Sequence, residues 1–324
     1  MPCTKEKRKY EMTNTKKIRN CLLLLLTAII WGMAFVSQQA GMDFMGPLTF
    51  TGSRNLIGSA VLIPVILVLR GRVPKSERAP LPVKTTIIGG VCCGLALTAA
   101  SLFQQYGLTM TTVGKGGFIT TLYIIITPIL GLLFHRKAPK AVWFCAVIAV
   151  FGMYLLCVGG ESFSVSTGDL LVLASAAIFA VHILIIDHFS PLTDGVILSC
   201  IQFFVCGVIS TIGAFIFEQP SWEQLISGAV PVLYAGVLSC GVGYTLQIVG
   251  QKGVDPTAAA LILSLESVVA TISGYIAYRI GFLKTDQTMT ARQIAGCAVV
   301  FTAVILVQLP WDGISRKLRE KQKQ

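Results

Sequence analysis

The sequence predicts an all-α integral membrane protein of ten transmembrane helices, built as two inverted five-helix repeats. Hydrophobic residues occupy 54% of the 324 positions and charged residues only 13%, about half the charged share of a soluble domain. Many apolar runs reach the roughly 20 residues that cross a bilayer. The halves also resemble each other, since residues 28–35 match residues 176–183 at a spacing of 148. Because each copy holds five spans, an odd number, the two copies enter the membrane in opposite directions.

Ten apolar runs define the expected spans and the domain boundaries. In chain order we expect spans at 20–39, 47–69, 85–107, 112–133, 141–158, 168–187, 195–217, 229–250, 256–278 and 291–309. The first repeat is then 20–158 and the second 168–309, between basic tails at 1–19 and 310–324.

Each span has its own justification in the sequence. The first follows a basic stretch and continues past Trp31 without a small-x-small cleavage site, which favours a retained helix over a signal peptide. The second and fourth contain Pro64 and Pro128, which kink helices. The third and eighth are rich in glycine, which lets helices pack closely. The fifth and tenth are plain apolar runs that end the repeats, the sixth and seventh repeat the first and second, and the ninth carries Glu266.

The basic residues behind the net charge of +11 are concentrated in alternate connections of the chain. Lysine and arginine concentrate in both tails and in the connections near 70–84 and 136–140, whereas 40–46, 159–168 and 218–228 contain none. This positive-inside pattern predicts cytoplasmic termini in the cell membrane and argues against nucleic acid as a partner. One connection disagrees, because Arg279, Lys284 and Arg292 flank a loop that this topology places outside.

The chain offers no motif for a cofactor or a metal. The ten cysteines contain no Cys-x-x-Cys, and the three histidines lack ligand spacing. The Gly114–Gly117 stretch lacks Walker spacing. We therefore expect no cofactor and no metal, and an ion or substrate gradient as the energy source.

Several motifs carry a resemblance to a known family. They are Trp31-Gly32, the segment 47–54, the segment 111–123 with Pro128, and the segments 255–261 and 265–268. In this order, over about residues 20–309, they resemble the EamA-type branch of the drug/metabolite transporter superfamily. The resemblance implies a ten-helix carrier of small metabolites, often amino acids or related compounds and frequently exported. It also implies a central cavity formed by spans one, three, four, six, eight and nine.

The chain departs from the family pattern at two places. It has Glu266-Ser267 where the family often has Glu-Pro, and His135-Arg136-Lys137 where Gly-Glu is common.

Charged residues inside the spans are the first site candidates, because a charge there is costly and is usually paired or functional. Glu266, near midplane, can bind substrate, a cation or a proton, or it can be structural and bonded to Ser264 or Ser267. Arg54 can hold a substrate carboxylate, pair with Glu266, or extend toward the interface. Lys115 can attract anions at an outer gate or can be an ordinary interfacial lysine beside glycines.

Neutral and weakly basic groups complete the candidate set. His182 can relay protons or serve as a structural donor. Gln104 and Gln247 match at a spacing of 143 and should both face the repeat axis. Tyr244 and Tyr123 can orient a ligand without the desolvation cost of a charge.

These observations favour a secondary transporter that moves a small solute by alternating access, since inverted repeats place a binding site between the halves. A membrane-embedded enzyme would need clustered acids or histidines at a membrane edge, and the short loops lack them. A channel or a scaffold without carrier activity is the third alternative. The expected partners are a small-molecule substrate, H+ or another coupling ion, and the lipid bilayer; substrate identity and oligomeric state are left open. The differences between the halves are the better guide to chemistry: Arg54 matches Gln202, Lys115 has no basic counterpart, and Glu266 aligns near Thr127.

Overall fold

The computed structural model describes residues 14–72, 81–132, 140–157, 166–251, 254, 259 and 262–307. Within these ranges the chain is helical and has no strand. Residues 1–13 and 308–324 of the tails, the basic connections near 73–80 and 133–139, and the motif at 255–258 lie outside the described residues. The last residues of the predicted N-terminal tail, 14–19, form the first turns of α1.

The helices follow the expected spans closely. The first repeat contains α1 (Asn14–Gly41), α2 (Pro47–Gly71), α3 (Val83–Leu108), α4 (Val113–Thr121), α5 (Tyr123–Gly131) and α6 (Lys140–Cys157). The second contains α7 (Thr167–Phe189), η3 (Ser190–Leu192), α8 (Gly195–Phe217), α9 (Trp222–Ser227), α10 (Ala229–Leu233), η4 (Tyr234–Gly243), α11 (Tyr244–Gly250), α13 (Glu266–Arg279) and α14 (Ala291–Val307).

Ten transmembrane segments are formed, although not all are long single helices. Seven segments of the described chain are long and apolar enough to cross a membrane, and two shorter apolar helices lie at Val142–Leu156 and Ala291–Val307. The remaining span contains α13, whose 14 residues rise only about 21 Å at 1.5 Å each. A turn at Ser264 and Leu265 separates α13 from the helical residues before it, so this span is interrupted.

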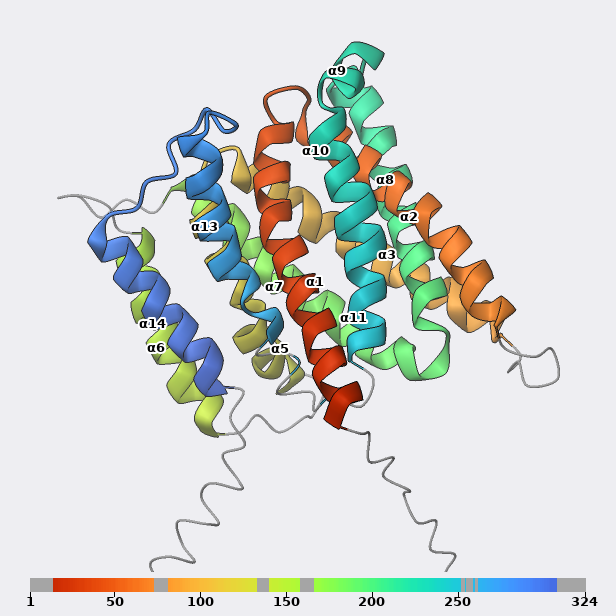
Figure 1. Ribbon diagram of the computed structural model, residues 1–324, viewed down its shortest axis with the longest axis horizontal. Coiled ribbons are helices and arrows are strands. Elements are labelled where there is room, and N and C mark those ends of the chain that lie inside the picture. Colours follow the sequence, from red (N-terminus) through yellow and green to blue (C-terminus); the bar gives the residue numbers. More distant parts are fainter. Residues whose placement is uncertain are drawn as a thin grey trace, which may run out of the picture.

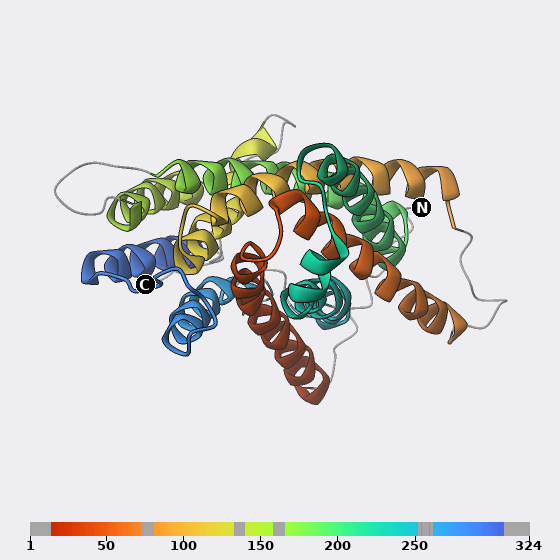
Figure 2. The same ribbon diagram turned by 90° about the horizontal axis from the view of Figure 1, so that it is seen from above.

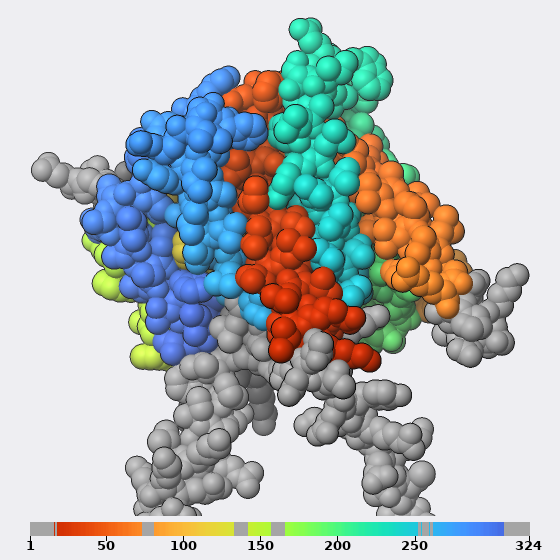
Figure 3. Space-filling model, in the orientation of Figure 1, coloured from red at the N-terminus to blue at the C-terminus, as the bar shows by residue number. Residues whose placement is uncertain are grey.

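The helices form two layers. In Figure 3, α14, α13, α1, the α10–α11 segment and α2 lie side by side on one face. The view from above shows the second layer behind them (Figure 2). Cross-layer packing joins α2 to α8 and α14 to α6. The first residues of α1 and the last residues of α14 lie at one end of the molecule (Figure 1); we call this end the terminus side and the opposite end the far side.

The packing is symmetric about an axis between the repeats. Helix α1 packs on α13 and on the η4–α11 segment, and the equivalent α7 packs on α4, α5 and α3. Pairs α2–α8 and α6–α14 join equivalent helices, and α4–α13 joins the fourth spans of the two repeats, so all three pairs cross the axis. Two matching bundles result: α1 with α10–α11 and α13, and α7 with α3, α4 and α5. We call them the α1 bundle and the α7 bundle.

The fourth span of each repeat is kinked near its middle. In the first repeat the kink is at Leu122, whose amide bonds the Ile119 carbonyl at 3.2 Å. Pro128 lies in the following turns and cannot donate a backbone hydrogen bond, which loosens the helix on its N-terminal side. In the second repeat the Ser267 hydroxyl donates to the Ser264 carbonyl at 2.9 Å, a back-bond that bends helices. The ninth span therefore bends without the family's proline.

The eighth span contains a wide π-helical segment, η4, over ten residues. Three hydrogen bonds join α1 to this span: Trp31 donates to Ser239 O at 3.2 Å, Tyr234 to Ile30 O at 3.2 Å, and Thr27 to Gly243 O at 3.5 Å. Such segments often lie at functional sites. Here α1 supplies donors for the displaced carbonyls, which would otherwise be costly in an apolar environment.

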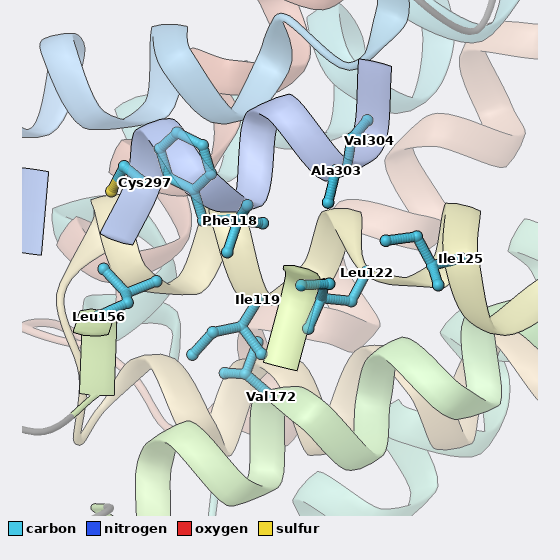
Figure 4. Close-up of a cluster of buried hydrophobic side chains, with 11 residues drawn as sticks. Phe118, Ile119, Leu122, Ile125, Leu156, Val172, Cys297, Ala303 and Val304 are labelled. Carbon is cyan, nitrogen blue, oxygen red and sulfur yellow. The ribbon is translucent and has the colours of Figure 1, made fainter. Parts of the chain in front are cut away.

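A buried apolar cluster anchors the end of the first repeat. Phe118, Ile119, Leu122 and Ile125 of the kinked fourth span pack with side chains of α6, α7 and α14 (Figure 4). The kink is thus held by tight packing from both repeats.

Candidate functional site

A cavity of about 720 Å³ lies between the repeats. Its wall includes residues of α1, α3, α4, α5, α7, η4, α11 and α13, the spans that the family resemblance implies, and also residues of α2 and α8. Helices α2 and α8 also contribute to the wall, because they pack against each other across the axis, directly behind the two bundles.

The cavity brings together nearly all of the residues that the sequence nominated. Those that line it are Glu266, Arg54, Gln104, Gln247, Tyr244, Tyr123 and His182. Lys115 is absent from the lining. Most of the wall is apolar, and polar groups are interspersed within it, an arrangement typical of small-molecule sites.

Glu266 and Tyr123 face each other from the two kinks. Each is the first residue of the half-helix after its kink, α13 and α5 respectively. Both side chains line the cavity, so the phenol and the carboxylate belong to one polar patch of its wall. The sequence alignment placed Glu266 near Thr127, but the helix bounds match it with Tyr123 at a spacing of 143. The hydroxyl of Ser267 is committed to Ser264, so it does not serve the carboxylate as a donor.

The guanidinium of Arg54 is buried but lacks a hydrogen-bond partner at its Nε. Its side chain is buried, with 8% of its surface exposed, and its guanidinium lies over the Phe50 ring at 5.8 Å. The buried Nε has no hydrogen-bond partner. Ion pairs between described residues join Lys115 to Asp169 and Lys284 to Asp43 and do not involve Arg54. An ion pair between Arg54 and Glu266 is therefore not formed in this conformation.

His182 is joined to the residue that matches Arg54. Its Nε2 lies 2.9 Å from Oε1 of Gln202, and both side chains are buried in α7 and α8. The amide oxygen accepts only if Nε2 carries the proton, so this contact selects the tautomer. The pair supplies a neutral polar patch in the cavity wall.

The remaining nominated groups form a mixed polar and aromatic surface. Gln104 donates to the Thr120 hydroxyl at 3.0 Å, which joins α3 to α4. Tyr244 packs between two rings, Trp31 at 5.1 Å and Phe203 at 4.9 Å between centroids. Gln247 lies one helical turn beyond Tyr244 on α11 and also lines the cavity.

Lys115 lies outside the cavity lining and pairs with a carboxylate. Its Nζ lies 3.2 Å from Asp169, whose other oxygen accepts from the Thr111 hydroxyl at 2.5 Å. The carboxylate is 1% exposed. Asp169 balances the charge of Lys115 outside the cavity, and the pair joins α4 to α7.

Several polar residues in or near the cavity were not among the candidates predicted from the sequence. Asn55, Ser101 and Ser199 line the cavity, but small polar residues within a span carry no distinctive pattern. Asp169 was detectable, since it is a carboxylate just inside the expected sixth span. Gln287 follows α13 in a connection, and only the tertiary structure shows that it is buried.

The described residues contain no group of three or more His, Cys, Asp or Glu side chains able to hold a metal ion. The site is therefore built from one cation, one carboxylate, amides, hydroxyls and aromatic rings. These groups can bind and orient an organic solute.

Comparisons with known proteins agree with this architecture. The model of the EamA-like transporter family matches residues 18–158 and 166–309. An uncharacterized transporter of Archaeoglobus fulgidus is 28% identical, with 91% of this chain and 87% of the relative covered. The threonine/homoserine exporter RhtA of Salmonella typhimurium is 26% identical, with 86% of this chain and 87% of that protein covered. A crystal structure of a protein 19% identical in sequence has the same fold, with a TM-score of 0.61 over 93% of this chain and 99% of that one.

Proposed function

The chain belongs to the EamA-like transporter family, and from this premise we propose that it is a secondary carrier that moves small organic solutes by alternating access. The observation that carries the proposal is the cavity of about 720 Å³ between two inverted repeats, with polar groups interspersed in its largely apolar wall. Inverted-repeat carriers bind their solute at such a place and expose it to each side in turn.

We favour amino acids or related compounds as the substrates. Arg54 offers a guanidinium with an unpartnered Nε, which suits a carboxylate. Glu266 offers a carboxylate in the same cavity, which suits an ammonium group. A relative named as a threonine/homoserine exporter supports both this class of solute and outward movement.

Glu266 is our candidate for coupling to a proton or another cation. It is a buried carboxylate at a kink between two half-helices. A proton that crosses the membrane potential supplies about 2.3 kcal/mol per 100 mV. Export of a solute against its gradient can draw on that free energy if Glu266 binds a proton on one side and the substrate on the other.

We place the carrier in the cell membrane with both termini in the cytoplasm, on the basis of the positive-inside pattern. The proposed repeats are 20–158 and 168–309, and the basic tails at 1–19 and 310–324 then lie on the cytoplasmic surface. Relatives named as transporters argue against an enzyme.

Thermal unfolding of the purified protein tests the substrate class. Amino acids, nucleosides, sugars and cationic drugs are compared at equal concentration, because a ligand that binds the folded state raises the unfolding temperature by mass action. We expect threonine-like amino acids to stabilise the protein. Stabilisation by cationic drugs alone would contradict the proposed substrate class.

Counterflow in proteoliposomes tests the carrier mechanism. Labelled threonine outside should accumulate transiently when unlabelled threonine is loaded inside, and the rate should saturate. Uptake that rises linearly with concentration would indicate a channel, and a protein that binds the amino acid without exchanging it would indicate a scaffold.

A further inference from the structure

The two ends of the cavity differ. Toward the terminus side its lining reaches Ser190, after α7, and Gln251, after α11, and both side chains are exposed. Toward the far side its lining ends at Gln38, which is 4% exposed. The cavity is thus open toward one end and closed at the other.

Close packing of α4 against α13 closes the far side. A Cβ atom placed on Gly117 would lie 2.9 Å from the Ala270 Cβ, and one placed on Gly274 would lie 2.9 Å from the Val113 Cβ. Real Cβ atoms do not approach so closely, so these glycines allow a contact that larger residues would prevent. Both glycines lie on the far side of the two kinks, at Leu122 and at Ser264–Leu265.

A network of buried glutamines lies beside this contact. Gln39 of α1 donates to the Thr111 carbonyl at 3.2 Å, and Gln105 of α3 donates to the Gln38 carbonyl at 2.9 Å. Gln287 donates to Gln39 at 3.0 Å and accepts from the Val113 amide at 2.8 Å. All three glutamine side chains are at most 6% exposed.

These contacts join the two bundles. Gln39 lies on α1, and Gln287 lies in the connection that follows α13 of the α1 bundle. Gln105 and Val113 lie on α3 and α4 of the α7 bundle, and Thr111 lies in the connection between these two helices. The Lys115–Asp169 pair lies within the α7 bundle and holds the Thr111 segment in place through the Thr111 hydroxyl. The cross-bundle bonds are therefore the ones that must break for the far side to open.

We propose that the α4–α13 glycine contact and the bonds of Gln39, Gln105 and Gln287 form the far-side gate of the carrier. The proposal rests on the alternating-access function proposed above. When the bundles separate at this end, the hydrogen bonds are lost and the two half-helices part beyond their kinks, so that the cavity opens to the far side.

Labelling of a single cysteine tests the gate without any substrate. Cys240 lines the cavity, so a chain in which it is the only cysteine reports access from each side. The reagent is a membrane-impermeant maleimide added to one side of proteoliposomes whose orientation is known. We expect Gln39→Leu with Gln287→Leu to raise far-side labelling about 25-fold, since the bonds to Thr111 and Val113 are both lost and each lost hydrogen bond shifts an equilibrium about 5-fold. Gly117→Leu should raise it similarly by wedging α4 from α13.

Matched controls use equivalent substitutions away from the contact. Gln224→Leu removes an amide whose bonds stay within the α9 cap, and Gly71→Leu adds a side chain where nothing lies within 4 Å. Both should label from the far side at the parent rate. Far-side labelling of the gate variants at the parent rate, in protein that unfolds cooperatively, would overturn the gate.

A cross-link gives the reverse test. In the Cys240 background, Val113→Cys with Gly274→Cys places two thiols across the gate. Because a side chain at position 274 itself presses on residue 113, the oxidised and reduced forms of this one variant are compared. Oxidation should suppress far-side labelling of Cys240 about 10-fold relative to the reduced form and leave labelling from the terminus side unchanged. Undiminished far-side labelling of the oxidised protein would contradict the proposal. A parent that passes these tests but does not exchange labelled threonine would instead refute the proposed substrate.

Discussion

The two repeats share a scaffold and differ in their cavity side chains. In the second repeat Ser175 of α7 donates to the Ala100 carbonyl of α3 at 2.8 Å. In the first, Thr27 of α1 contacts the Gly243 carbonyl of η4 at 3.5 Å. Thr27 and Ser175 are 148 residues apart and Ala100 and Gly243 are 143 apart, so the same cross-repeat contact occurs twice. Polar contacts that hold the helices together thus obey the symmetry.

The ionisable groups of the cavity do not obey it. Arg54 matches Gln202, Glu266 matches Tyr123, and His182 matches Ala34 at the same spacings. All six residues line the cavity. In each pair one repeat carries an ionisable group that the other repeat lacks or replaces with a weaker one. The comparison teaches that duplication produced the cavity and that later divergence produced its chemistry.

The largest expected effect follows from making Glu266 neutral. Glu266→Gln should lower threonine counterflow about 100-fold, because a hydrogen bond to a charged group is worth about 1.5–3 kcal/mol and coupling is lost as well. Tyr123→Phe, the matched change in the other repeat, should lower it only several-fold. The measurement is counterflow rate as a function of pH. A Glu266→Gln carrier with unchanged rate and pH dependence would refute the coupling role.

Substitutions in the Arg54–Gln202 pair test whether the cation binds the solute. Arg54→Gln should weaken amino-acid binding about 30-fold, since it removes the bidentate donor for a carboxylate. The threonine concentration that half-saturates the thermal shift measures this loss. Gln202→Asn, which retains an amide, is the matched control and should cost less. Equal affinity in wild type and Arg54→Gln would show that Arg54 does not contact the solute.

A smaller effect is expected where the repeats differ in helix spacing. A Cβ on Gly32 would lie 2.7 Å from the Glu266 carbonyl oxygen, whereas the matching Ala180 is accommodated and fully buried. Gly32→Ala should destabilise the fold by about 2 kcal/mol through overpacking, and Ala180→Gly by about 1 kcal/mol through helix propensity. Unfolding temperatures in detergent compare the two. A more stable Gly32→Ala protein would mean that α1 shifts freely against α13.

The smallest effect is expected from removing the hydroxyl-to-carbonyl contact that occurs in both repeats, made by Ser175 and by Thr27. Ser175→Ala should cost about 1 kcal/mol, the usual net value of a hydrogen bond. Thr27→Val should cost less, because its hydroxyl lies closer to the Leu23 carbonyl of its own helix, at 3.0 Å, than to Gly243. Denaturation of both variants under one condition ranks them. The opposite ranking would show that the α1–η4 contact is the stronger one.

Local composition was enough to predict the spans. Predicted boundaries such as 195–217 and 229–250 coincide with the helical segments, because the length of a transmembrane helix is set by the bilayer. The ionisable cavity residues were also predictable, since a charge in an apolar span is costly and rarely incidental. The ion pair of Lys115 was not predictable, because its balancing carboxylate, Asp169, lies on another helix.

The sequence by itself therefore determined the fold class, the repeat and most of the polar residues that face the cavity. Only the tertiary structure decided how these residues are paired. The placement of Tyr123 and Glu266 in one cavity wall, the His182–Gln202 contact, the buried Gln287 and the end at which the cavity closes all depend on packing between residues far apart in the chain. Hydropathy and spacing describe how each segment meets the bilayer, whereas a hydrogen bond between two segments depends on their relative rotation and depth, which side-chain packing sets.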